Sequence, residues 1–70
     1  MMPLSMMNVG DGSSIKKVSG KEDVRQFLET LGFIPGTKVR LITKNAGNVI
    51  VGIKESRVAI SREMAMKIMV

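Results

Sequence analysis

Residues 31–42, LGFIPGTKVRLI, constrain the fold of this chain more than any other segment. Gly32 ends an apolar helical pattern, where a left-handed C-cap residue is expected, and glycine adopts that conformation without a Cβ penalty. Pro35-Gly36 predicts a type II turn, because proline sets the first central φ and glycine supplies the positive second one. From Thr37 onward polar and apolar residues alternate, as in a strand. The segment therefore predicts a helix that leads directly into the sheet of a very small protein.

The residues before this segment predict one amphipathic helix. Its apolar face is formed by residues at the spacing i, i+3, i+4 and i+7, namely Val24, Phe27, Leu28 and Leu31. Ser19 and Glu22 fit a capping box, in which the serine hydroxyl accepts from the N3 amide and the glutamate reaches back. We therefore expect the helix to begin just after Ser19 and to bury one face.

Short segments on either side of the helix predict strands. They cover residues 14–18, 37–44, 48–53, 57–60 and 68–70. Residues 45–47 predict a tight hairpin loop in which Gly47 is available for a positive φ, and Ser61 is the predicted N-cap of a short helix over residues 62–66. Five short strands, one inserted helix and a helical turn before the last strand predict a mainly β fold, a small SH3-like barrel. Its 70 residues form one domain, 1–70, in which we expect poor order, if anywhere, in residues 1–8.

The chain lacks the side chains that most metal sites and many active sites use, because it has no histidine and no cysteine. Its six acidic residues are scattered, no nucleophile has an evident base, and no G-x-x-x-x-G-K-[ST] phosphate loop occurs. The seven methionines are more simply core or interface residues than Cu(I) ligands, and those in residues 1–8 are expected in a loosely packed start. We therefore expect a non-catalytic protein without catalytic, cofactor-binding or metal-binding residues of its own.

The formal net charge of +5, from eleven basic and six acidic residues, is compatible with simple solubility or with an acidic partner. Aromatic residues are limited to Phe27 and Phe33, which weighs against the stacking platforms of single-stranded nucleic-acid binding. No run approaches the roughly 20 apolar residues of a membrane span, and no signal peptide is evident. Together with the absence of cysteine, this leads us to expect a cytoplasmic protein.

Strand alternation predicts a candidate partner-binding patch. One face of the hairpin strands carries the inward residues Val39, Leu41, Val49, Val51, Ile53, Val58 and Ile60. The opposite face carries Lys38, Arg40, Ile42, Lys44, Asn48 and Ile50. The patch residues are Arg40, Ile42, Lys44 and Ile50, with Lys54 of the adjoining turn. A loop centred on Ala46 places Ile42 directly across from Ile50. This apolar pair within basic residues would suit an apolar partner with an acidic rim. The alternative is that the inserted helix or a second copy of the chain covers the pair.

Two motifs at matching separation, LGFIPG at residues 31–36 and AISREMAMKIMV at residues 59–70, resemble those of the ferrous iron transport protein A (FeoA) family. The resemblance covers the chain from Leu4 on. The chain departs from the family pattern in loops: at Ser13, in the short loop 45–47 and at the turn 54–56.

The resemblance implies an SH3-like cytoplasmic accessory protein that is neither a transporter nor an enzyme. Such a protein would act by binding the GTPase-bearing cytoplasmic part of a ferrous iron permease. The family is also associated with transition-metal ions, although no ligand set is evident in this chain. Homodimer formation stays open. The rival hypothesis is a basic SH3-like module that binds nucleic acid.

Overall fold

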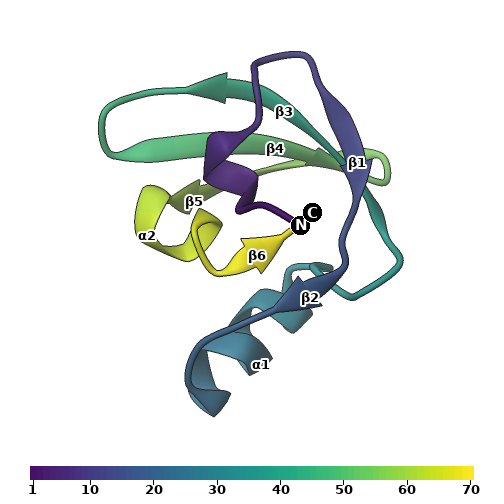
Figure 1. Ribbon diagram of the computed structural model, residues 1–70, viewed down its shortest axis with the longest axis vertical. Helices are drawn as coiled ribbons and strands as arrows, with labels where there is room; N and C mark the ends of the chain where they lie inside the picture. The colour runs from purple at the N-terminus through teal and green to yellow at the C-terminus, as the bar shows by residue number, and fades with distance from the viewer.

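Two antiparallel sheets and two α-helices make up the fold, which a computed structural model describes over residues 1–70 (Figure 1). The larger sheet has the strand order β1-β3-β4-β5, and β2 pairs with β6. The elements in chain order are the 3-10 helix η1 (Leu4–Met6), β1 (Gly12–Ser14), β2 (Lys17–Val18), α1 (Glu22–Thr30), β3 (Lys38–Lys44), β4 (Asn48–Ile53), β5 (Ser56–Ser61), α2 (Arg62–Ala65) and β6 (Ile68–Met69). This confirms the predicted mainly β architecture, with a helix inserted after the first strands and a helical turn before the last.

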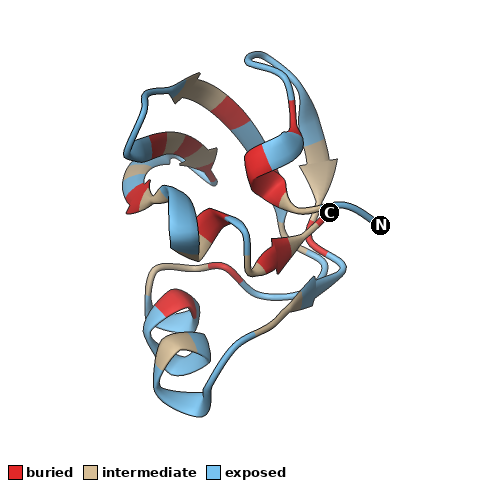
Figure 2. Ribbon diagram, turned by 60° about the vertical axis from the view of Figure 1, so that its left-hand side comes forward, coloured by how far each residue is buried: buried red, intermediate tan, exposed pale blue.

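The buried residues of successive elements form a single apolar core (Figure 2). Its members are Leu4, Met7, Ile15, Leu28, Phe33, Val39, Leu41, Val49, Val51, Ile53, Ile60, Ala65, Ile68 and Val70. Nearly every element contributes at least one of these side chains. The core therefore holds the short strands together, since a strand pair alone is only marginally stable in water.

The predicted helix stop at Gly32 is confirmed. Gly32 has a φ of 101°, its N–H donates to Glu29 O at 2.9 Å, and the N–H of Phe33 donates to Leu28 O at 3.0 Å. These two bonds form a Schellman motif, which satisfies the last carbonyls of α1. Phe33 and Leu28 are both buried in the core, so the motif also directs the chain from the helix into the barrel.

The predicted turn at Pro35-Gly36 is also confirmed. Gly36 has a φ of 93°, and the N–H of Thr37 donates to Ile34 O at 3.0 Å. The turn is tied to the segment that follows β1, because Gly36 N–H donates to Ile15 O at 2.8 Å and Ile15 N–H donates to Thr37 O at 2.9 Å. The turn therefore places β3 beside β1.

The single strand predicted over residues 14–18 is two strands. β1 begins at Gly12 and pairs with β3, whereas β2 pairs with β6 in the other sheet. Ile15, between them, is buried in the core at the point where the chain passes from one sheet to the other. Alternation within five residues could not reveal this change of partner.

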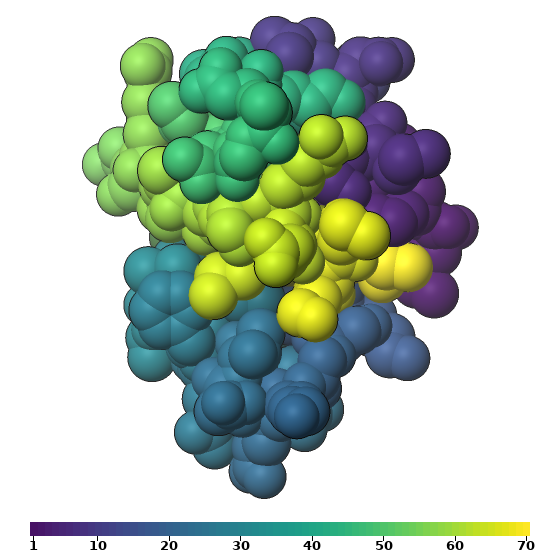
Figure 3. Space-filling view, turned by 90° about the vertical axis from the view of Figure 1, so that its left-hand side faces the viewer, coloured from purple at the N-terminus to yellow at the C-terminus, as the bar shows by residue number.

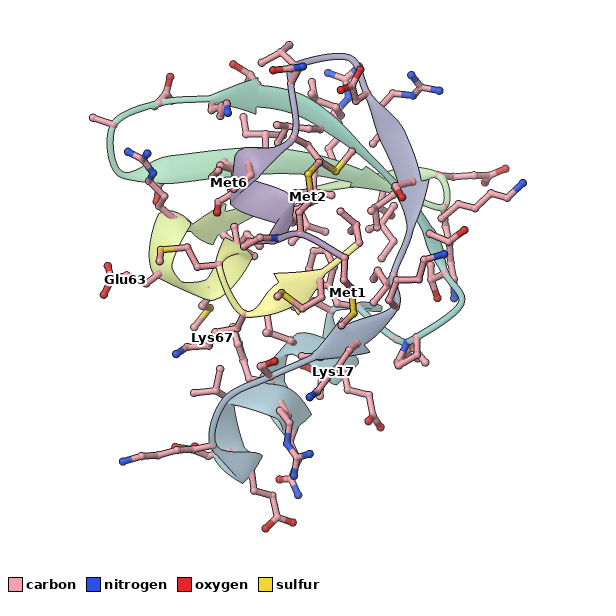
Figure 4. All side chains as sticks on the ribbon, viewed as in Figure 1. Met1, Met2, Met6, Lys17, Glu63 and Lys67 are labelled. Atoms are coloured by element: carbon pink, nitrogen blue, oxygen red, sulfur yellow. The ribbon has the colours of Figure 1, made fainter.

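The capping box predicted at Ser19 and Glu22 is wrong. α1 begins at Glu22, and its N-cap is Lys21, which makes no side-chain capping bond. The backbone of Ser19 is engaged elsewhere, since its N–H donates to Lys67 O at 2.7 Å and so continues the β2–β6 pairing. The stem of Lys67 also lies close to Gly20, where a Cβ would come within 2.9 Å of its Cδ (Figure 4).

The apolar stripe of α1 is only partly packed. Leu28 is its only buried residue, Val24 and Leu31 are half-buried, and Phe27 is 47% exposed. Figure 1 shows α1 beyond the β2–β6 pair rather than against the larger sheet. The helix therefore uses a narrow edge of its predicted apolar face.

The amino-terminal segment packs against the carboxyl terminus. The N–H of Met2 donates to Val70 O at 3.0 Å, and the N–H of Val70 donates to Met2 O at 2.8 Å. Leu4 and Met7 are buried in the core, so the expectation that Met7 lies in a loosely packed start is wrong. In the space-filling view, the first residues (purple) lie against the last ones (yellow) (Figure 3). The start of the chain therefore closes one side of the core.

Candidate binding groove

Strand alternation correctly predicts the inner face of the hairpin strands. Val39, Leu41, Val49, Val51, Ile53 and Ile60 are all buried, and Val58 is half-buried against them. Figure 1 shows α1 away from the larger sheet, and neither helix contributes a residue to the groove on the opposite face, which is described below. The alternative that the inserted helix covers this face is therefore wrong.

A β-bulge at Ile42 changes the predicted outer face. Leu41 pairs with Val51, but Thr43 pairs with Ile50, so Ile42 has no partner. The predicted pairing of Ile42 with Ile50 is therefore wrong. A bulge inserts one residue into a strand and shifts the alternation of all residues that follow it.

Lys44 consequently lies on the other face. It pairs with the buried Val49, and its Nζ donates to Ser5 O, in η1, at 3.3 Å. Lys44 therefore ties the end of the hairpin to the amino-terminal segment and does not belong to the predicted patch. Thr43 takes its place on the outer face, opposite the half-buried Ile50.

A row of four residues crosses the outer face of the larger sheet. In this row Gly12 of β1 pairs with Arg40, Arg40 with Gly52, and Gly52 with Arg57 of β5. Two arginines thus flank a glycine at the centre of the sheet. A Cβ on Gly52 would lie 3.1 Å from Ile42 Cδ1, so the bulged isoleucine lies over the glycine. Glycine within a strand often marks such a close approach.

Arg40 is held by the loop before β1. Its Nη1 donates to Gly10 O at 2.6 Å, and its Nη2 would lie 3.6 Å from a Cβ on Gly12. The guanidinium therefore lies against the β1 side of the row.

An open groove of about 830 Å³ runs over this face. It is lined by Gly12, Ser13, Ser14, Thr37, Lys38, Val39, Arg40, Ile42, Gly52, Lys54, Glu55, Ser56 and Arg57. Its charged side chains are four basic residues, Lys38, Arg40, Lys54 and Arg57, and one acidic residue, Glu55. All four basic residues are exposed. The groove can therefore attract an anionic ligand.

Lys54 has an unusual backbone conformation at the edge of the groove. It has a φ of 54°, the only positive φ outside glycine, in the two-residue loop between β4 and β5. Residues other than glycine, asparagine and aspartate seldom adopt this backbone conformation. The predicted loop glycine, Gly47, by contrast does not take a positive φ.

The structure brings together three of the five residues predicted for the patch. Arg40, Ile42 and Lys54 line the groove, Ile50 lies on the same face of the sheet outside it, and Lys44 is elsewhere. Arg57 was missed, although its alternation with the inward Val58 signals an outward side chain. Lys38, which was predicted on the same outer face but not counted among the patch residues, also lines the groove.

No three carboxylates lie close enough together to form a metal site. Neither α-helix is long and apolar enough to cross a membrane. The groove brings together four basic residues from β3, β5 and the turn between β4 and β5.

The fold and its uncovered face define a small SH3-like β domain with an open basic groove. A model of the FeoA domain matches residues 2–70, and the chain belongs to the FeoA family. A Methanocaldococcus jannaschii protein, provisionally named Fe(2+) transport protein A, is 37% identical over the whole chain and 85% of that protein.

Solved structures share the fold. The crystal structure of an iron uptake regulatory protein (FeoA) has a TM-score of 0.89 at 26% identity, over 96% of this chain and 91% of that one. Stenotrophomonas maltophilia FeoA, solved with zinc, has a TM-score of 0.83 at 22% identity, over 97% and 87%. That protein is described as a prokaryotic SH3 domain protein with a suggested role as a ferrous iron transport activating factor. The likeness confirms the predicted SH3-like fold.

Proposed function

We propose that this protein is a non-catalytic, cytoplasmic accessory module of ferrous iron uptake that binds the GTPase-bearing cytoplasmic part of an iron permease. Membership of the FeoA family and the relative named for Fe(2+) transport support a role in iron transport. The role suggested for S. maltophilia FeoA, an activating factor, supports an accessory one. The groove is made of basic, hydroxyl-bearing and apolar side chains, which is consistent with a regulatory role without catalysis.

The observation that carries this proposal is the uncovered outer face of the larger sheet. Most of the apolar side chains of the sheet are buried within the core, yet Ile42 and Ile50 are only half-buried on the opposite face, beside four exposed basic residues. A mixed apolar and charged face is typical of surfaces that bind a protein partner. Neither helix of the chain occupies it.

The experiment is a binding titration with the isolated cytoplasmic domain of the permease. Replacing Arg40 and Arg57 together by Gln should weaken binding about tenfold or more, since each charged hydrogen bond contributes about 1.5–3 kcal/mol. The matched control, Lys16→Gln with Lys17→Gln, removes the same charge from exposed residues outside the groove. Equal weakening by both variants, or no binding by the wild-type protein, would contradict the proposal.

The four basic residues of the groove also favour a second candidate, binding of nucleic acid. Phosphate contacts alone give salt-sensitive and sequence-independent binding. Neither Phe27 nor Phe33 lines the groove, so it has no base-stacking surface. Gel-shift titration with duplex and single-stranded probes at physiological salt separates the two functions: micromolar binding there would favour nucleic acid.

A further inference from the structure

We infer that the groove binds an extended, acidic segment of the partner protein, with two carboxylates and one apolar residue at alternate positions. This inference rests on the proposed function and specifies the chemistry that the partner presents. It follows from three features of the groove: the spacing of its basic residues, the fixed position of Arg40, and the apolar end formed by Ile42.

The spacing of the basic residues matches an extended chain. Lys38 and Arg40 stand two residues apart on β3, so their side chains leave the same face of the strand roughly 7 Å apart. Side chains at alternate positions of an extended peptide repeat at the same interval. Carboxylates at positions i and i+2 of such a peptide can therefore meet Lys38 and Arg40 together. Arg57 and Lys54 line the far wall and add positive charge on the other side of the peptide.

The guanidinium of Arg40 is positioned to bind a carboxylate. Its bond to Gly10 O uses one of the five N–H donors of the guanidinium. The remaining donors can form a bidentate pair with a carboxylate, which is among the stronger hydrogen-bonded arrangements in proteins. Because the side chain is already held against β1, less conformational entropy is lost on binding than for a free arginine.

Ile42 gives the groove a direction. It lies two residues after Arg40, and the bulge places its Cδ1 over Gly52, the cross-strand partner of Arg40. An apolar side chain of the partner can pack against Ile42, which is only half-buried. The order along β3 is therefore basic, basic and apolar, which the partner complements with acidic, acidic and apolar residues at alternate positions.

Charge complementarity selects this partner over others. Glu55 is the only acidic residue of the groove, so a basic peptide would meet four like charges. Ser14 pairs with Lys38 on the same face of the sheet, so its hydroxyl offers a neutral donor beside that lysine. Nucleic acid could place its phosphates against the basic residues, but the groove offers no aromatic surface for its bases. The apolar contact at Ile42 would not contribute to phosphate binding.

The test uses a fluorescein-labelled peptide of sequence GSESESLSG and a second peptide with Gln in place of both Glu residues. Fluorescence anisotropy should show the acidic peptide binding about tenfold or more tightly than the Gln peptide, with affinity falling as salt rises. Lys38→Gln with Arg40→Gln should remove that preference. Lys16→Gln with Lys17→Gln, which removes equal charge outside the groove, should keep affinity within about twofold. Equal binding of the two peptides, or equal weakening by both variants, would overturn the inference.

Arg40→Lys separates the geometry from the charge. It keeps the positive charge but loses the planar fork, so affinity for the acidic peptide should fall severalfold. Full retention of affinity by this variant would overturn the bidentate role of Arg40. Two-dimensional amide spectra of each variant verify the fold, and in the wild-type protein the peptide should shift Gly12 and Gly52 most. Shifts confined to α1 would contradict the site.

The inference and the proposed function fail separately. If the permease domain binds through Arg40 and Arg57 but the acidic peptide does not bind, the inference is wrong and the proposed function stands. If the peptide binds in the groove but the permease domain does not bind, the inference stands and the proposed function is wrong. Displacement of the bound peptide by substoichiometric duplex or single-stranded nucleic acid would overturn both.

Discussion

Gly32 and Gly36 place two left-handed residues within the connection between α1 and β3, residues 31–37. Gly32 terminates the helix through the Schellman bonds, and Gly36 completes the turn whose hydrogen bond joins Thr37 to Ile34. Both conformations carry a penalty for any residue with a Cβ. At the residue scale, the connection depends on left-handed backbone conformations that glycine adopts without a Cβ penalty. Both positions can be recognised from the residues that flank them in the sequence.

Gly32→Ala should lower the free energy of unfolding by roughly 1–2 kcal/mol, the cost of a left-handed alanine. A Cβ there would also lie 3.3 Å from Ile53 Cδ1. Urea denaturation followed by circular dichroism measures the difference. The control is Gly47→Ala, since Gly47 lacks a positive φ and its Cβ would meet nothing within 4 Å. Equal effects of the two substitutions would contradict the role of Gly32.

The boundaries of the elements depend on which of several possible hydrogen bonds each segment forms. Ser61 and Ser19 both precede a short helical pattern and both resemble N-caps. Ser61 Oγ does accept from the N–H of Met64 at 3.1 Å, whereas the backbone N–H of Ser19, three residues before α1 begins, donates to Lys67 O. β3 behaves similarly: its alternation holds up to Leu41, and the bulge at Ile42 then sends Lys44 to the other face.

Ser61→Ala should destabilise the protein by about 1 kcal/mol, since it removes the hydroxyl that caps α2. Ser19→Ala provides the comparison, because the hydroxyl of Ser19 makes no capping bond to α1. Its effect should stay within about 0.5 kcal/mol, as for most surface substitutions. Thermal and urea unfolding of both variants measure the difference. A larger loss from Ser19→Ala than from Ser61→Ala would mean that α1 begins at the capping box after all.

At the scale of the whole molecule, the two ends of the chain complete the core. Leu4 and Met7 pack with Ile68 and Val70 in one cluster, and backbone bonds between Met2 and Val70 close the structure. A domain of 70 residues has a small core, with a net stability on the order of 3–5 kcal/mol. The loss of one large buried side chain is therefore a considerable fraction of the total.

Leu4→Ala should reduce stability by about 2–5 kcal/mol and leave much of the protein unfolded at room temperature. The physical reason is the cavity left by a side chain that is wholly buried. Met6→Ala, two residues along and 67% exposed, should change stability by less than about 0.5 kcal/mol. Circular dichroism and amide spectra at a fixed temperature compare the two. A folded Leu4→Ala protein of wild-type stability would show that the amino-terminal segment is dispensable to the core.

The candidate groove was only partly predictable from the sequence. Alternation correctly placed Arg40 and Ile42 outside the core, because in a regular strand each residue's face follows from its neighbours. Alternation placed Lys44 on the wrong face, because a bulge depends on how two strands pair and cannot be recognised from the identity of the displaced residue. Arg57 was missed because its approach to Arg40 across Gly52 exists only once three strands are in register.

Features that depend on a few adjacent residues could be predicted from the sequence. These are the helix stop at Gly32, the turn at Gly36, the cap at Ser61, the inward residues of the hairpin and the motifs of the family. Contacts between distant segments became evident only in the folded molecule: the split of residues 14–18 between two sheets, the pairing of Ser19 with Lys67, and the burial of Leu4 and Met7. The difference arises because a backbone N–H or an apolar side chain can be satisfied by several partners, and long-range packing selects among them.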